Sequence, residues 1–177
     1  MSAIVVTESI ALGAVDELLT THEGELRTRF PSFFRKAAEH LPPVPDSGKA
    51  EAVIRKHCPQ ALLVRPGEGG FFNALWELCE TAEAGCEVEL LKIPVRQETI
   101  EILDFFQLNP YYSLCAGTLL FAADEGERLV AELREEGIPA VVIGFLRKGR
   151  RREIRCREHI RCLDRPQAEE MEKVRKR

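Results

Sequence analysis

The sequence predicts an α/β or α+β sandwich rather than a helical bundle, on two observations. Short apolar segments with the composition of strands alternate along the chain with longer segments whose apolar residues recur at helical spacing. The chain also has 177 residues, 45% of them hydrophobic and 31% charged, which is enough for one sizeable core with or without an arm. Its formal net charge of −4 is ordinary for a globular protein and weighs against nucleic acid as the main partner.

The N-terminal part predicts a strand followed by helices. The β-branched run from Ile4 to Thr7 has strand composition, and apolar spacing predicts a helix over residues 14–20. A second helical series runs from Leu26 to Leu41 and contains Pro31. Because proline cannot sit inside a regular helix, Pro31 must kink this helix or start a new one.

The clearest break in the chain is the segment 41–48, which carries three prolines and then Asp-Ser-Gly. Such composition is typical of a linker or turn. We therefore expect an N-terminal strand and helical arm over residues 1–48 and a compact domain over residues 49–177.

After the break, helical and strand patterns alternate. The strands are expected over residues 61–64, 86–93, 118–123 and 140–146. The helices are expected over residues 50–57, 69–84 and 126–136, with another that starts after Pro94 and buries Ile100, Leu103 and Phe106. Near the C-terminus, period-two spacing predicts a hairpin with Ile154, Cys156, Ile160 and Cys162 on its inner face, followed by a short helix over residues 168–176.

A glycine-rich loop between a strand and a helix is the first candidate site. Free N–H groups at a helix start, together with the helix dipole, favour anions, and Arg65 could add a bidentate partner for phosphate. The loop matches neither common phosphate-binding motif, since Phe72 stands at the last glycine position, and Glu68 would repel an anion. A structural turn is therefore the favoured alternative. The candidate phosphate-binding residues are Arg65, Gly67, Gly69 and Gly70.

The cysteines are the second candidate. There are six of them, without a C-x-x-C pair or an N-terminal leader pattern, so we expect free thiols rather than disulfides. Cys156, His159 and Cys162 could offer three zinc ligands, but a structural zinc site takes four at tighter spacing. Core thiols beside an exposed turn histidine are favoured, and no metal is expected.

The third candidate is the basic segment from Arg147 to Arg161, with eight basic residues against Glu153 and Glu158. It could contact nucleic acid, an acidic partner or phosphates. It has no interleaved aromatic residues for stacking on bases, so a solvated hairpin face is the favoured reading. No catalytic acid, base or nucleophile can be named from the sequence. No apolar run is long enough to cross a bilayer, and we expect a cytoplasmic protein.

Several short motifs follow one another in a fixed order: Gly69-Gly70, Ile93-Pro94, Glu98-Thr99, Leu108-Asn109-Pro110, Gly117-Thr118-Leu119-Leu120 and residues 137–144. In this order they resemble the C-terminal domain of the aminoimidazole ribonucleotide (AIR) synthase superfamily. The likeness is greatest to AIR-synthase-related proteins near the hydrogenase maturation factor that dehydrates a carbamoylated cysteine. The resemblance implies an α+β fold, a three-layer α/β/α sandwich with partial ferredoxin-like topology.

The resemblance also implies that magnesium and ATP are held by a separate N-terminal domain with Asp-rich motifs. This sequence has no such acidic motif, so we expect no cofactor here, and ATP with Mg²⁺ only through a partner that supplies that domain. The family loop commonly begins Asp-Pro-Thr, where this chain has Arg65 and Gly67 at the Asp and Thr positions. The maturation factor also needs a C-terminal cysteine, whereas Cys162 lies fifteen residues before Arg177 (177 − 162 = 15).

Three hypotheses follow. The preferred one is a stand-alone AIR-synthase-related domain that is not catalytic alone and that binds a phosphorylated small molecule or a family partner. The second is one subunit of a split ATP-dependent enzyme related to AIR synthase or to the carbamoyl dehydratase. The third is a structural homo-oligomer with no ligand.

Overall fold

The computed structural model describes residues 1–32 and 46–176. In these ranges the elements are, in chain order, β1 (Ala3–Thr7), α1 (Leu12–Thr21), α2 (Glu23–Arg29), α4 (Ser47–His57), β2 (Leu62–Val64), α5 (Gly70–Thr81), β3 (Gly85–Glu89), the 3-10 turn η1 (Leu90–Lys92), α6 (Gln97–Phe105), the 3-10 turn η2 (Pro110–Tyr112), β4 (Leu120–Ala123), α7 (Gly126–Glu135), β5 (Ala140–Arg147), β6 (Arg152–Cys156), β7 (His159–Cys162) and α8 (Glu172–Arg175).

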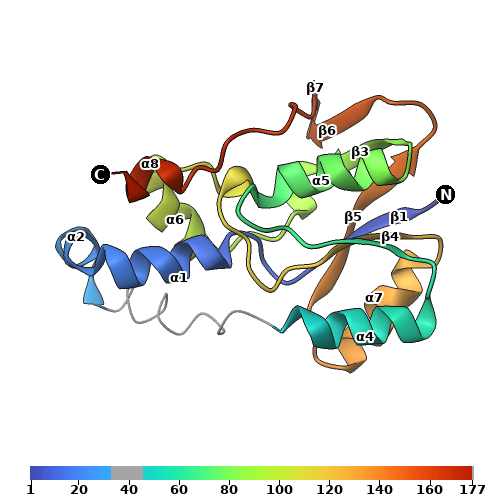
Figure 1. The fold of residues 1–177 in the computed structure, drawn as a ribbon, viewed down its shortest axis with the longest axis horizontal. Helices are drawn as coiled ribbons and strands as arrows, with labels where there is room; N and C mark the ends of the chain where they lie inside the picture. Colours follow the sequence, from blue (N-terminus) through green and yellow to red (C-terminus); the bar gives the residue numbers. More distant parts are fainter. Residues whose placement is uncertain (33–45, 177) are drawn as a thin grey trace.

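One mixed sheet runs through the molecule in the strand order β2-β4-β1-β5-β3-β6-β7. Neighbouring strands are antiparallel except β3 and β6, which are parallel. The N-terminal strand β1 lies between β4 and β5, so the first residues of the chain form the middle of the same sheet as the later ones (Figure 1).

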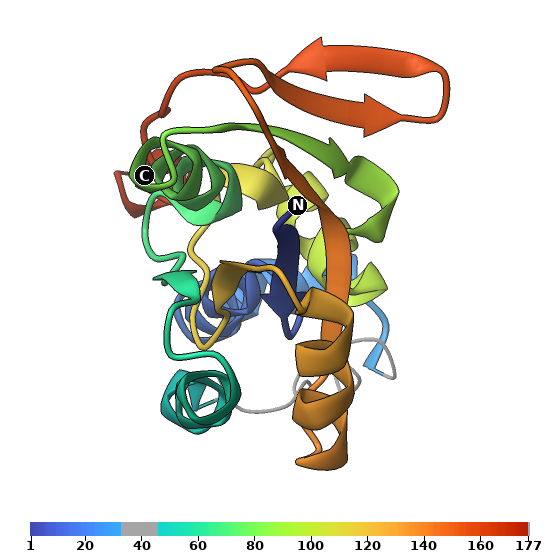
Figure 2. The ribbon, with the colours of Figure 1, turned by 90° about the vertical axis from the view of Figure 1, so that its right-hand side faces the viewer.

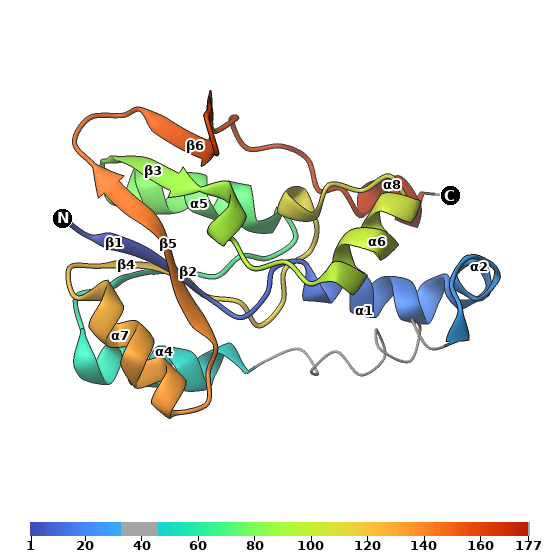
Figure 3. The ribbon, with the colours of Figure 1, turned by 180° about the vertical axis from the view of Figure 1, so that it is seen from behind.

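Helices cover both faces of the sheet, as the three-layer α/β/α prediction requires. Helices α4 and α7 lie on one face, and α1, α5 and α6 lie on the other (Figures 1 and 3). Alternate residues of β1 enter the two cores: Ile4 and Val6 pack with α1 and α5, whereas Ala3 and Val5 pack with α4 and α7. A strand buried on both faces must be apolar throughout, which explains the unbroken β-branched run.

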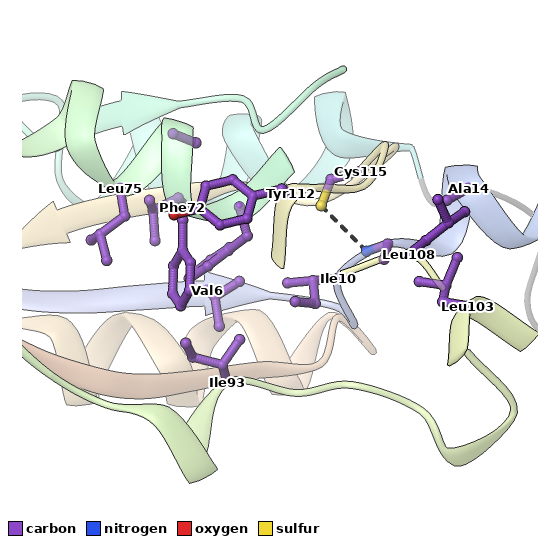
Figure 4. Packing of buried hydrophobic residues seen from close by; sticks show 14 of the residues in the cluster. Val6, Ile10, Ala14, Phe72, Leu75, Ile93, Leu103, Leu108, Tyr112 and Cys115 are labelled. Carbon is purple, nitrogen blue, oxygen red and sulfur yellow. Dashed lines mark hydrogen bonds between the residues drawn. The ribbon is translucent and has the colours of Figure 1, made fainter. Parts of the chain in front are cut away.

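The larger core joins α1, α5 and α6 to the sheet (Figure 4). Phe72 and Leu75 reach it from α5, Val6 from β1 and Leu103 from α6. All four side chains are fully buried, so this face supplies much of the apolar burial that stabilises the fold.

Two predicted elements differ from the structure at this point. The strand expected over residues 86–93 ends at Glu89 and continues as η1. In α6, Ile100 is 43% exposed, although it was expected in the core. The buried series is instead Thr99, Ile102, Leu103 and Phe106. This is the i, i+3, i+4, i+7 spacing of one helix face, and Ile100 lies outside that face.

The predicted second helix is only partly open to comparison. Helix α2 ends at Arg29, just before Pro31, which agrees with a break there. The rest of that prediction, from Phe33 to Leu41, and most of the proline-rich break lie outside the described residues. Within the part of the chain that is described, no helix is long and apolar enough to span a bilayer.

Candidate functional site

The four predicted ligand residues lie together in the loop between β2 and α5. The carbonyl of Gly67 accepts two backbone hydrogen bonds, from the N–H of Gly70 at 3.0 Å and from the N–H of Cys115 at 3.1 Å. The first bond closes a turn directly before α5, and the second ties this turn to the segment that leads into β4. The loop is therefore held from two sides by backbone alone.

Glycine is required at position 70 for two separate reasons. Its φ of +74° lies in the left-handed region that side chains disfavour. A β-carbon there would also lie 2.5 Å from the backbone of Tyr112. The close approach brings the start of α5 against η2, where Phe72 stacks on Tyr111 with ring centroids 4.6 Å apart.

Several polar groups of this loop are engaged within the protein. The N–H of Gly70 bonds to Gly67, and the N–H of Phe71 interacts with the thiol of Cys115. The guanidinium of Arg65 pairs with Glu51 on α4. Phosphate binding by Arg65, Gly67, Gly69 and Gly70 stays a prediction, for which an anion would have to compete with these bonds.

Cys115 lies at the junction of the loop, α1 and α5. Its sulfur accepts a hydrogen bond from the N–H of Ala11 at 3.2 Å, drawn as the dashed line in Figure 4. Burial raises the pKa of this thiol to about 12, against smaller opposite contributions from the N–H groups of Ala11 and Phe71. The side chain is therefore a neutral thiol near neutral pH, and its role is to accept backbone N–H groups.

The C-terminal segment 163–176 packs across the start of α5. No sequence pattern predicts this contact. The side-chain amide of Asn73 donates to the carbonyl of Gln167 at 2.8 Å and accepts from the N–H of Gln167 at 3.0 Å. The N–H of Glu170 donates to the carbonyl of Tyr112 at 3.2 Å. Arg175 then bonds to Glu17 on α1 at 2.6 and 2.7 Å.

The predicted hairpin exists, but its cysteines do not share a face. Cys156 pairs with His159 and Glu153 pairs with Cys162 across β6 and β7, around the two-residue turn Arg157-Glu158. The prediction assumed a three-residue turn, and a slip of one residue turns every side chain of a strand to the other face. Cys162 is exposed and Cys156 is half-buried, so neither is a core thiol.

The other four cysteines are buried free thiols, as expected. Cys79 on α5 and Cys86 on β3 hydrogen-bond to each other beside Arg152. This bond and burial raise the pKa of Cys86 far above its usual range, whereas the same bond and Arg152 lower the pKa of Cys79. Among the described residues, no group of three or more His, Cys, Asp or Glu side chains could hold a metal ion.

The basic segment is partly neutralised by ion pairs. Arg147 and Arg155 pair with Glu87 at 3.2 and 3.4 Å, and Arg151 pairs with Glu153 at 2.7 Å. Arg152 is buried, pairs with Glu80 and lies over the ring of Trp76. The sequence favours a solvated hairpin face for this segment. In the structure many of its basic side chains form ion pairs, and Arg152, in the middle of the segment, is buried.

The family of the chain follows from comparison with known proteins. Residues 63–157 match the model of the AIR synthase related protein, C-terminal domain, which covers more than half of the chain. This chain belongs to the AIR-synthase-related family. The matched region runs from β2 to the turn that precedes β7, so it contains the glycine loop and ends before the C-terminal segment.

Within this family the chain is similar to carbamoyl dehydratase HypE. It is 32% identical to HypE of Rhodobacter capsulatus over 80 residues, which are 43% of this chain and 24% of that protein. The solved structure of E. coli HypE superposes with a TM-score of 0.77 at 16% identity, over 98% of this chain and 52% of that one. A HypE–HypF complex gives a TM-score of 0.69 at 15% identity, over 93% and 53%.

These structures show that the chain has the fold of the AIR-synthase-related C-terminal domain. The chain spans about half the length of the HypE structures that it matches. The predicted family and fold class are therefore confirmed.

Proposed function

We propose that this AIR-synthase-related domain works by binding a partner protein rather than by holding a phosphorylated small molecule in its glycine loop. The observation that carries the proposal is that two of the loop's candidate anion donors, the N–H of Gly70 and the guanidinium of Arg65, already have partners within the chain. A phosphate would have to displace Glu51 from Arg65 and would still meet Glu68 beside it. A protein partner needs none of these groups.

The comparisons support a partner of the kind that HypE has. HypE, which superposes on 93% of this chain, has been solved as a complex with HypF. We therefore expect the partner of this chain to be a HypF-type or HypE-type protein. The chain would then contribute a preformed binding domain, since its described residues already form two hydrophobic cores.

The test is direct association. Purified chain is mixed with a HypF-type protein and, separately, with a full-length HypE-type protein, and each mixture is followed by size-exclusion chromatography with light scattering. A stoichiometric complex with either protein supports the proposal. Failure to associate with both, at concentrations of about 50 μM that would reveal weak transient binding, contradicts it. The same light-scattering trace of the chain alone tests the homo-oligomer hypothesis.

Phosphate binding is tested separately by calorimetric titration with ATP, AMP and inorganic phosphate. We expect no heat of binding from any of them. Binding that disappears in Arg65→Ala would instead establish the loop as an anion site and overturn the preference for a protein partner.

A split ATP-dependent enzyme is the second candidate function, because the chain is similar to a carbamoyl dehydratase, HypE. On this view ATP and Mg²⁺ would be held by another polypeptide. ATP hydrolysis is measured for the ATP-binding half of a HypE-type protein, with and without this chain. Stimulation by the chain supports the candidate, and unchanged hydrolysis argues against it.

A further inference from the structure

Strand β7 forms a free edge of the sheet. It is the last strand in the order, and among the described residues it pairs with β6 alone (Figure 2). All four of its residues, His159–Cys162, are exposed, and Ile160 keeps 51% of its surface accessible. Exposed edge strands present unpaired backbone groups that can bind another strand.

The register shows which backbone groups face outward. The N–H of Leu163 donates to the carbonyl of Arg152 at 2.8 Å, so these two residues occupy a hydrogen-bonded position of the ladder. In an antiparallel ladder hydrogen-bonded pairs alternate with pairs that are not bonded to each other. Arg161 and His159 therefore also bond to β6, whereas the N–H and C=O groups of Ile160 and Cys162 point away from it.

The segment that contains most of this edge is basic. Residues 147–161 contain eight basic and two acidic residues, a net charge of +6 (8 − 2 = 6). Because the whole chain carries −4, the remaining residues carry −10 (−4 − 6 = −10). Lys148 and Arg150 before β6 and Arg157 in the hairpin turn form no ion pair with any residue that the structure describes.

We propose that β7 is a docking edge for an extended, acidic segment of a partner protein, which adds to the sheet as a further strand beside His159–Cys162. This inference rests on the proposed function, since it assigns the kind of segment that the partner inserts. Backbone N–H and C=O groups of Ile160 and Cys162 bind the segment, and its acidic side chains face Arg157 and the other unpaired cations.

A peptide fits this edge better than a nucleic acid does. Nucleic acids bind to basic surfaces through phosphates and stacked bases, and β7 and its turn carry no aromatic residue. An added strand pairs with both the outward N–H and the outward C=O groups, whereas phosphates, which only accept hydrogen bonds, offer no donor to the C=O groups. The apolar side chain of Ile160 also offers a contact for alternate residues of an added strand.

The experiment uses the full chain and a fluorescent peptide of about eight residues that alternate Glu and Val. A Lys-Val peptide and a single-stranded RNA serve as the other probes. Binding is followed by fluorescence anisotropy at two salt concentrations. Wild type should bind the acidic peptide, more weakly at high salt, and should not bind the Lys-Val peptide.

Ile160→Pro is the decisive variant, because it removes an outward N–H and leaves the bonds to β6 intact, as proline at a sheet edge can. We expect it to weaken peptide binding at least about fivefold, from one lost hydrogen bond and the steric effect of the ring. Ile160→Thr keeps the N–H and should bind within about twofold of wild type. Circular dichroism and the urea midpoint of each variant show that it is folded.

Three results would overturn the inference: no binding of the acidic peptide to wild type, equal binding to wild type and Ile160→Pro, or RNA binding that displaces the peptide and is unchanged by proline. Its failure can be told apart from that of the proposed function. If the HypF-type or HypE-type complex forms and Ile160→Pro leaves it unchanged, the chain binds a partner but not through β7. If no complex forms with wild type, the proposed function itself fails.

Discussion

The guanidinium of Arg152 lies over the indole ring of Trp76, with its central carbon 3.8 Å from the ring centroid. The same side chain pairs with Glu80, and only 8% of it is exposed. Through these two contacts Arg152 joins strand β6 to helix α5. Cation–π contacts contribute most when the cation is desolvated, which is the case here.

Replacing Arg152 should destabilise the protein. We expect Arg152→Ala to lower the free energy of unfolding by about 2 kcal/mol, from the lost cation–π contact and the lost packing of the side-chain stem. Arg152→Lys should lie between the two, because lysine keeps the charge without the planar group. The measurement is urea unfolding at pH 7. Arg150→Ala is the matched control, since Arg150 is exposed, and it should change stability by less than about 0.5 kcal/mol. Equal effects at both positions would contradict this role.

The glycine loop allows a paired test. Gly70→Ala puts a β-carbon 2.5 Å from the Tyr112 backbone at a φ of +74°, whereas a β-carbon at Gly67 would meet nothing within 4 Å. We expect Gly70→Ala to cost about 2–4 kcal/mol and Gly67→Ala to change stability by less than about 1 kcal/mol. Thermal or urea unfolding of both variants measures the difference. A well-tolerated alanine at position 70 would mean that α5 and η2 are not held as closely as the structure has them.

Thiol chemistry should separate the cysteines by burial. Cys162 is exposed, Cys156 is half-buried, and the other four are buried. In native protein we expect Cys162 to react first with a thiol reagent such as DTNB, then Cys156, and the remaining four only after unfolding. Cys162→Ser should remove the fast phase. A fast phase that survives in this variant, or three fast thiols in wild type, would contradict the placement of β7.

The outcome at the hairpin shows what a periodic pattern can and cannot specify. Apolar residues at period two correctly predicted two strands after Arg152. Which side chains share a face depends on whether the turn has two or three residues, and Arg157, with a φ of 56°, makes the shorter turn. A left-handed φ on arginine leaves no mark in composition, so the register could not be derived from the residue types.

The candidate site illustrates a second limit. The loop Arg65 to Gly70 was found from its position between a strand and a helix, which is local information. Its partners are distant in sequence: Cys115 bonds to Gly67, and Gln167 bonds to Asn73 at the start of α5. Such contacts depend on tertiary packing, so the sequence predicted the loop without predicting these contacts.

The pH dependence of stability should differ in sign at two glutamates that contact Arg175. A hydrogen bond from Arg175 is the main cause that lowers the pKa of Glu17, although burial opposes it. A lowered pKa in the folded state contributes stability above the ordinary carboxyl pKa, and this contribution is lost as the pH falls through the folded value. Glu17→Gln should therefore be less stable than wild type at pH 7, by less than about 1 kcal/mol because the pair is partly exposed. The difference should vanish in acid.

Glu169 should behave in the opposite way. Burial raises its pKa, with further increases from Glu68 and Glu17, and Arg175 only partly offsets them. A raised carboxyl pKa contributes stability at low pH that is lost as the pH rises through the folded value. The stability of wild type relative to Glu169→Gln should therefore increase from pH 7 towards pH 4, while its stability relative to Glu17→Gln decreases. Urea unfolding of the three proteins at half-unit pH intervals would measure both trends. Parallel trends would mean that Arg175 does not hold the C-terminal segment against α1 through this pair of carboxylates, because the opposite signs depend on the Arg175 hydrogen bond outweighing burial at Glu17 and on burial outweighing Arg175 at Glu169.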